Sequence, residues 1–117
     1  MATGTIRPEI VRPEQIGGRT FYYVNMASAA TVTIETLSSI VGAVLFFGSA
    51  TASRNGAYIM FVGNTTTEPT ITPIVAASGI TITPSAGKIT ITSNGATYLS
   101  VMCMYEVTVD RIKVTKT

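Results

Sequence analysis

The stretch from Ser78 to Gly95, SGITITPSAGKITITSNG, alternates isoleucine with threonine in two near-copies. Side chains two residues apart lie on the same face of a β-strand, so Ile80 and Ile82 share one face and the threonines take the other. Threonine favours strands and can face water without carrying charge. This alternation therefore predicts a β-hairpin with a buried isoleucine face and an exposed threonine face.

The length of the connection in this hairpin decides which side chains meet. An even loop at Pro84 to Gly87 would place Ile82 opposite Ile89, and one step further Ile80 would face Ile91. Threonines would then also pair, Thr81 with Thr90. An odd loop would pair isoleucine with threonine and bury hydroxyl groups. We expect the even loop, with Gly87 supplying the permissive backbone near its exit.

Short strands separated by turn signals run through the rest of the chain. Asn94-Gly95 predicts a tight hairpin that returns through Thr97 to Tyr105, and Asn55-Gly56 predicts another between the apolar run near Ala50 and the segment 57–63. Further strands are expected at 20–26, 30–35 and 70–76, where Pro73 indicates an edge or a bulge, and a bulge or turn is expected at Asp110-Arg111. The fold class expected is all-β: an antiparallel β-sandwich or jelly roll of eight to ten short strands, formed by one domain at residues 20–117.

Composition excludes several classes of protein. The net charge is +2 and charged residues make up 12% of the chain, too few for a protein whose main partner is nucleic acid. The longest apolar run, Ile40 to Gly48, is far shorter than the roughly 20 residues of a membrane-spanning helix, so membrane insertion is not expected. The first residues lack the apolar centre of a signal peptide. The single cysteine, Cys103, is interpreted as a core side chain.

Three segments are apolar on both faces, unlike the isoleucine-threonine strands. They are 40–47, 57–62 and 97–105. One domain of this length cannot cover both faces of a sheet, so a second copy of the chain is the expected cover. The alternative is an elongated or closed barrel whose own loops cover those faces. The oligomer interface is expected at Phe47, Tyr58, Met60, Tyr98, Met102 and Met104.

The first nineteen residues are interpreted as an extended arm. Arg7-Pro8 and Arg12-Pro13 repeat the sequence Arg-Pro-Glu, and each proline favours extended backbone before it. Gly17-Gly18 then forms a hinge. The arm is expected to order against a partner through Arg7, Pro8, Arg12 and Pro13. The alternative is a floppy terminus with a chance repetition.

Catalytic chemistry finds no support in the sequence. The chain has no histidine, its six acidic residues are scattered, and phosphate loops, nucleophile elbows and zinc spacings are missing. We expect no enzyme, no cofactor and no metal. Arg54, Asn55 and Asn64 are the loop groups best suited to a ligand, although a purely structural role is favoured, with Asn55 serving its turn and Arg54 a solvated loop charge.

The segments AYIMFVGN, GITITPSAGKITIT and SNGATYLSVMCMYE follow one another in an order that resembles small trimeric β-sandwich modules on the virions of tailed bacteriophages. The resemblance covers roughly Thr20 to Tyr105 and is one of pattern and composition. It implies a homotrimeric virion protein, as a head fibre, decoration protein or tail-fibre tip. It also implies attachment to other virion proteins and contact with host-surface glycans or proteins. The alternative function is a free-standing carbohydrate- or protein-binding β-module.

Overall fold

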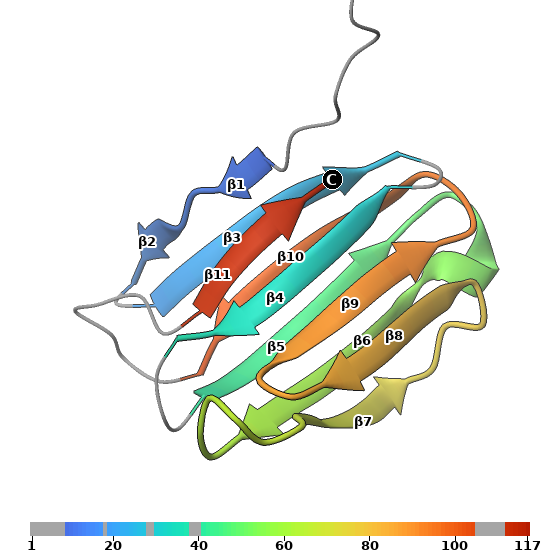
Figure 1. Ribbon diagram of the computed structural model, residues 1–117. Helices are drawn as coiled ribbons and strands as arrows, with labels where there is room; N and C mark the ends of the chain where they lie inside the picture. Colours follow the sequence, from blue (N-terminus) through green and yellow to red (C-terminus); the bar gives the residue numbers. More distant parts are fainter. Residues whose placement is uncertain (1–8, 18, 28–29, 38–40, 105–111) are drawn as a thin grey trace, which may run out of the picture.

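Two antiparallel β-sheets pack face to face in the computed structural model, which describes residues 9–17, 19–27, 30–37, 41–104 and 112–117 (Figure 1). The five-stranded sheet has the order β1 (Glu9–Val11), β11 (Ile112–Lys116), β4 (Thr31–Thr36), β9 (Lys88–Ser93) and β8 (Ile80–Ser85). The six-stranded sheet has the order β2 (Glu14–Ile16), β3 (Arg19–Met26), β10 (Thr97–Cys103), β5 (Val41–Gly48), β6 (Gly56–Val62) and β7 (Thr70–Val75). The expected β-sandwich is confirmed, but eleven strands are described where eight to ten were expected, because β1 and β2 form within the first nineteen residues.

The core lies between the sheets and follows the two-residue period. Ile89 and Ile91 are fully buried on β9, and Val32 and Ile34 are fully buried beside them on β4. From the opposite sheet, apolar side chains of β3, β5, β6 and β10 complete one continuous cluster. The isoleucines thus face inward and the threonines outward, as the alternation predicts.

The β8–β9 hairpin has the predicted faces but a different register. Ser85 lies opposite Lys88, so the loop is two residues long rather than four, and Ile82 faces Ile91 instead of Ile89. Both loops are even, which is why the isoleucine face is preserved. Pro84 can extend β8 because this strand lies at the sheet edge, where a missing N–H breaks no ladder. Gly87 has a φ of 71°, the permissive backbone expected there.

The two Asn-Gly pairs do not form tight hairpins. After Asn94-Gly95 the chain leaves β9 in one sheet and enters β10 in the other, so this pair marks a crossover. Asn55-Gly56 does stand between two paired strands, β5 and β6, but the connection is longer and contains a short 3-10 helix, η1 (Ala52–Arg54). An Asn-Gly pair reports permissive backbone, and it does not say which sheet the chain enters next.

Two further predictions concern the strand edges. Pro73 lies on β7, the edge of the six-stranded sheet, and the register between β6 and β7 shifts at Ala57/Tyr58, which confirms an edge with a bulge. The bulge or turn expected at Asp110-Arg111 lies outside the described residues.

The described part of the expected arm is built into the sandwich. β1 pairs with β11 of one sheet, and β2 pairs with β3 of the other. Residues 9–16 therefore connect the two sheets along one side of the molecule (Figure 1). Gly17, with a φ of 58°, follows β2 where the chain turns into β3. Residues 1–8 lie outside the described part of the chain.

Candidate functional site

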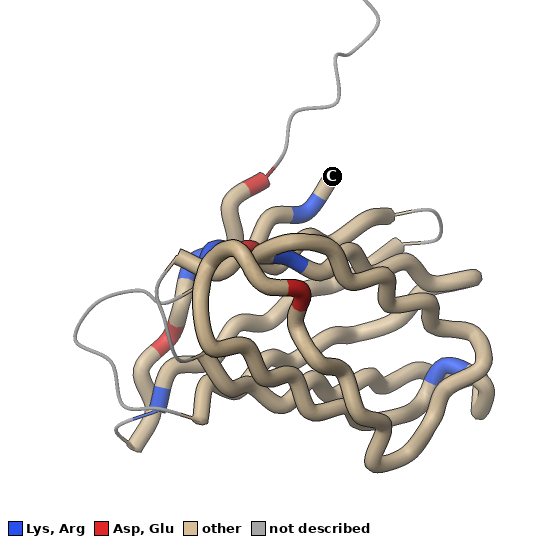
Figure 2. Tube along the Cα trace, turned by 60° about the horizontal axis from the view of Figure 1, so that its bottom comes forward, with Lys and Arg blue, Asp and Glu red and all other residues tan. Residues whose placement is uncertain are grey.

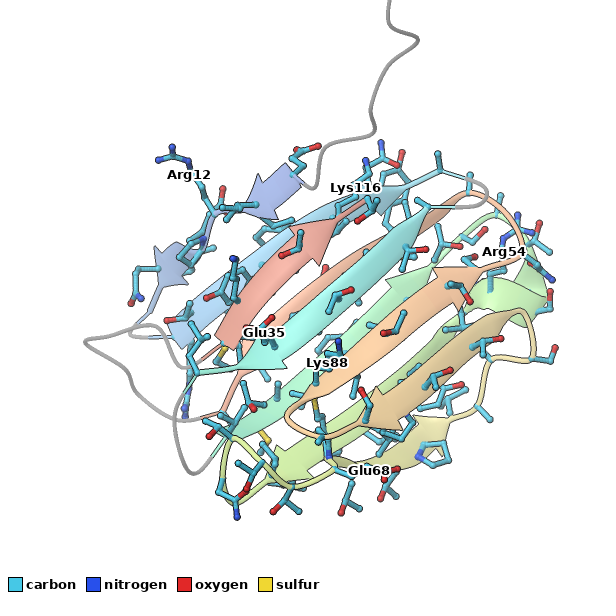
Figure 3. All side chains as sticks on the ribbon, in the orientation of Figure 1. Arg12, Glu35, Arg54, Glu68, Lys88 and Lys116 are labelled. Atoms are coloured by element: carbon cyan, nitrogen blue, oxygen red, sulfur yellow. The ribbon has the colours of Figure 1, made fainter. Side chains whose placement is uncertain are left out.

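The loop residues expected to bind a ligand hold their own loops instead. All three side-chain nitrogens of Arg54, in η1, donate hydrogen bonds to neighbouring loop groups. Its Nε donates to Ser49 Oγ at 3.2 Å, its Nη2 to Thr51 Oγ1 at 2.9 Å and its Nη1 to Asn94 Oδ1 at 3.3 Å. The guanidinium also lies so close to Gly95 that a side chain there would collide with it. Arg54 thereby ties the β5–β6 connection to the β9–β10 crossover, at the end of the sandwich where Figure 3 labels it.

Asn55 and Asn64 act within single loops. Asn55 Oδ1 accepts a hydrogen bond from the Ser49 backbone N–H at 2.9 Å, and its Nδ2 donates to the carbonyl oxygens of Ser49 and Thr51. Asn64 Oδ1 accepts from the backbone N–H groups of Thr66 at 2.9 Å and Thr67 at 2.8 Å. Arg54 and Asn55 share the β5–β6 connection, whereas Asn64 lies in the β6–β7 connection, and no hydrogen bond joins Asn64 to the other two in the described part of the chain.

The acidic and metal-ligating groups form no centre among the described residues. No set of three or more histidine, cysteine, aspartate or glutamate side chains gathers there. Cys103 is buried on the inner face of β10. Among the described residues, no helix is long and apolar enough to cross a bilayer.

The outer face of the six-stranded sheet is the most unusual surface of the molecule. Large apolar side chains stand in water there on neighbouring strands: Tyr23, Tyr98, Phe46, Phe61 and, just after β10, Met104. Tyr98 is 65% exposed, Tyr23 49% and Phe46 44%. Exposed apolar side chains that gather on one face usually mark an interaction site.

The strand register explains why these rings stay exposed. Phe46 has Ser100 and Ala57 as its cross-strand neighbours, and Tyr98 is opposite Gly48. Small neighbours cannot cover an aromatic ring. Val44, on the same face, lies between Met102 and Ile59 and is only 7% exposed. The face thus alternates covered aliphatic positions with uncovered rings.

Charge is nearly missing from this face. Along the described strands β3, β10, β5 and β6 the one charged residue is Arg19, whose Nη1 donates to the Met104 carbonyl oxygen at one end of the sheet. Figure 2 shows charged residues concentrated near one end of the sandwich and long stretches of uncharged trace elsewhere. A charge-poor, aromatic sheet face suits an apolar partner.

The six residues expected at an oligomer interface divide between the two faces of this sheet. Tyr98, Met102 and Met104 lie on the outer face. Phe47, Tyr58 and Met60 face inward and belong to the core, at 4%, 9% and 0% exposure. Phe47 and Tyr58 pack edge to face with their ring centroids 5.8 Å apart. A surface between folded copies therefore cannot include these three side chains.

Tyr23, Phe46 and Phe61, which the prediction did not include, lie on the outer face. When both parities of a strand are apolar, the strand alone does not say which side faces inward. The neighbouring strand does: β3 carries Tyr22 and Val24 inward with Tyr23 and the polar Asn25 outward. If β5 and β6 had been aligned with β3 in the prediction, Phe46 and Phe61 would have been assigned to the outer face.

The residues expected to attach the chain to a partner are only partly described. Arg12 and Pro13 are exposed and form the link between β1 and β2. Arg7 and Pro8 lie outside the described residues.

Comparison with known proteins identifies no relative: no family model, no curated protein and no solved structure matches this chain.

Proposed function

We propose that this chain is a non-enzymatic structural protein of a tailed-phage virion, a homotrimeric β-sandwich appendage that serves as a head fibre, decoration protein or tail-fibre tip. The N-terminal segment attaches it to other virion proteins, and its exposed loops contact glycans or proteins of the host surface. The observation that carries the proposal is the aromatic outer face of β3, β10, β5 and β6, on which Arg19 is the one charged residue among the described strand residues.

Burial energetics support self-association through that face. Five large side chains on it are between 37% and 65% exposed. Covering a large apolar side chain stabilises an assembly by about 1.5 to 3 kcal/mol when burial is complete. A partner with the same charge-poor face would bury few charges, and a second copy of the chain supplies such a face. A trimer additionally follows the pattern of the phage modules that the sequence resembles.

The test measures mass first and particle association second. Purified protein should run as a trimer at micromolar concentration, and it should remain with phage particles through density-gradient purification. A monomeric mass over the whole accessible concentration range would remove the basis of the proposal. Arg12→Ala combined with Pro13→Ala leaves the outer sheet face untouched, so this variant should stay trimeric while losing particle association.

A free-standing binding module is the alternative. It would act through its loops, and Arg54, Asn55 and Asn64 would be its contacts. Their side chains are already engaged within the loops. Binding of a carbohydrate on a glycan array by a monomeric protein, abolished by Asn64→Ala, would favour this alternative.

A further inference from the structure

Arg54 lies against one of the two Asn-Gly pairs of the chain. Its Nη1 donates to Asn94 Oδ1 at 3.3 Å. The same guanidinium lies over Gly95, where a Cβ atom would collide with it. A cation of the β5–β6 connection is therefore adjacent to both residues of the Asn94-Gly95 pair in the β9–β10 crossover.

An asparagine followed by glycine can react with its own backbone. The backbone nitrogen of the glycine loses its proton and attacks the carbonyl carbon of the asparagine side chain, and the approach is open because glycine has no side chain. A succinimide ring forms when the new N–C bond is made and the bond to the side-chain nitrogen breaks, which releases ammonia. Water then opens the ring, so asparagine and water give ammonia and either aspartate or isoaspartate.

We propose that Asn94 converts spontaneously to an aspartyl residue and that Arg54 promotes the reaction. Attack on the side-chain carbonyl carbon places negative charge on Oδ1, the atom that already accepts the hydrogen bond from Arg54. A donor aimed at the oxygen where charge develops stabilises the transition state. The positive charge beside Gly95 also favours the anion that forms when the Gly95 nitrogen loses its proton.

The reacting groups of this pair are free to move. Asn94 is exposed, and its Nδ2, the leaving nitrogen, forms no hydrogen bond among the described residues. The Gly95 N–H belongs to no strand and donates to Ser93 Oγ at 3.4 Å, which is long for such a bond. The carbonyl oxygen of Gly95, by contrast, accepts from Ser93 Oγ at 2.7 Å and Thr97 Oγ1 at 3.1 Å. The crossover thus holds the carbonyl side of Gly95 and leaves its nitrogen available.

Asn55-Gly56 has the same sequence in a setting that opposes the reaction. Asn55 Nδ2 donates to the carbonyl oxygens of Ser49 at 2.9 Å and Thr51 at 3.1 Å, so its leaving nitrogen is held. Gly56 is already part of β6. A Cβ atom at Gly56 would lie 2.6 Å from the Val75 carbonyl oxygen, so this backbone has little room to rotate toward the asparagine side chain. Asn55 should therefore persist where Asn94 reacts.

The conversion changes the charge at this end of the sandwich. One added carboxylate lowers the formal net charge by one, from +2 to +1. In the aspartate form the hydrogen bond from Arg54 becomes an ion pair that joins the β5–β6 connection to the β9–β10 crossover. In the isoaspartate form the backbone of the crossover is longer by one methylene group.

Peptide mapping by mass spectrometry, after incubation of the full chain at mildly alkaline pH, measures conversion at both Asn-Gly pairs. Asn94 should convert faster in the folded protein than in guanidinium chloride, and Asn55 should convert more slowly in the folded protein. In water enriched in heavy oxygen, the product should carry one oxygen atom from the solvent. Arg54→Gln should slow conversion at Asn94 by about tenfold, because one donor to the developing oxyanion is lost at a partly exposed site.

The direction of the Arg54→Gln effect separates promotion of the reaction from support of the loop. If Arg54 only held the loop, its removal would loosen the crossover and speed the conversion. Equal or faster conversion in a folded Arg54→Gln protein would therefore overturn the proposal. Circular dichroism shows whether this variant keeps its fold. If it unfolds, wild type decides, because conversion of Asn94 no faster in the folded than in the unfolded chain equally contradicts the proposal. The reaction takes place within one copy of the chain, so its outcome does not depend on the trimer of the proposed function.

Discussion

Replacing Phe46 by threonine should weaken self-association without unfolding the chain. Phe46 lies on β5 within the aromatic outer face and is 44% exposed. A phenylalanine side chain offers on the order of 200 Å², so about 90 Å² of this one stays in water until another copy covers it. At about 25 cal/mol per Å², covering it contributes about 2 kcal/mol per subunit. Threonine removes most of that area and keeps a strand-favouring residue.

The effect on a trimer is larger than the effect on one subunit. Three subunits lose about 6 kcal/mol together, which lowers the association constant by about 10⁴-fold at about 1.4 kcal/mol per factor of ten. The concentration at which a trimer half dissociates varies with the inverse square root of that constant. It should therefore rise by about 100-fold.

Light scattering coupled to size-exclusion chromatography, over a dilution series, measures this shift. The wild-type mass should approach three times the 12.3 kDa of one chain, and Phe46→Thr should fall to one chain mass at concentrations where wild type is still assembled. Ile10→Thr is the matched control, because Ile10 is 63% exposed but lies on β1 in the other sheet. Urea unfolding should change little for either variant, since neither position belongs to the core.

The reasoning is refuted if Phe46→Thr dissociates at the same concentration as wild type. It is equally refuted if Ile10→Thr dissociates instead, because a different surface would then hold the copies together.

Three further predictions concern the stability of the chain. Gly87→Ala should lower the free energy of unfolding by about 1 to 3 kcal/mol in a urea titration, because alanine is strained at a φ of 71° and its Cβ would collide with the Thr65 carbonyl oxygen. Gly63→Ala changes a glycine at an open position, so it should change that free energy by less than about 1 kcal/mol. Arg54→Gln should cost about 1 kcal/mol in that assay and speed amide exchange in the β5–β6 connection, whereas unchanged exchange would mean that its hydrogen bonds do not hold the loop. Deleting residues 1–16 removes β1 and β2, so it should lower the thermal unfolding temperature and promote aggregation through the freed sheet edges. Deleting residues 1–8 removes no described strand and should leave the unfolding temperature unchanged.

The local period of the sequence predicted the faces of strands well. Ile89 and Ile91 alternate with threonine, and only one face of such a strand can be buried, so the inward side follows directly. The same logic failed for β5 and β6, where Phe46 and Phe47 are equally apolar and only the neighbouring strands decide which one enters the core.

Turn residues predicted where strands end, but they did not predict which sheet the next strand joins. Gly87 has the positive φ that its turn needs, which a residue type can report. Whether the chain after Asn94-Gly95 returns along its own sheet or enters the opposite one depends on contacts far away in sequence. The outward-facing threonines of the five-stranded sheet are a similar case. Each Thr-x-Thr pair is visible in the sequence, and their alignment into rows depends on pairings between strands as distant as β4 and β11.

Because β11 lies between β1 and β4, the five-stranded sheet can be completed only after β11 has formed. During synthesis, Glu9–Val11 emerges among the first residues and finds its hydrogen-bonding partner only when Ile112–Lys116 has left the ribosome. Until then β4 shows one unpaired edge to solvent, and β1 has no place to dock. A nascent chain of this topology therefore keeps an exposed strand edge until residues 112–116 join the sheet, and this edge favours pairing between incompletely folded copies.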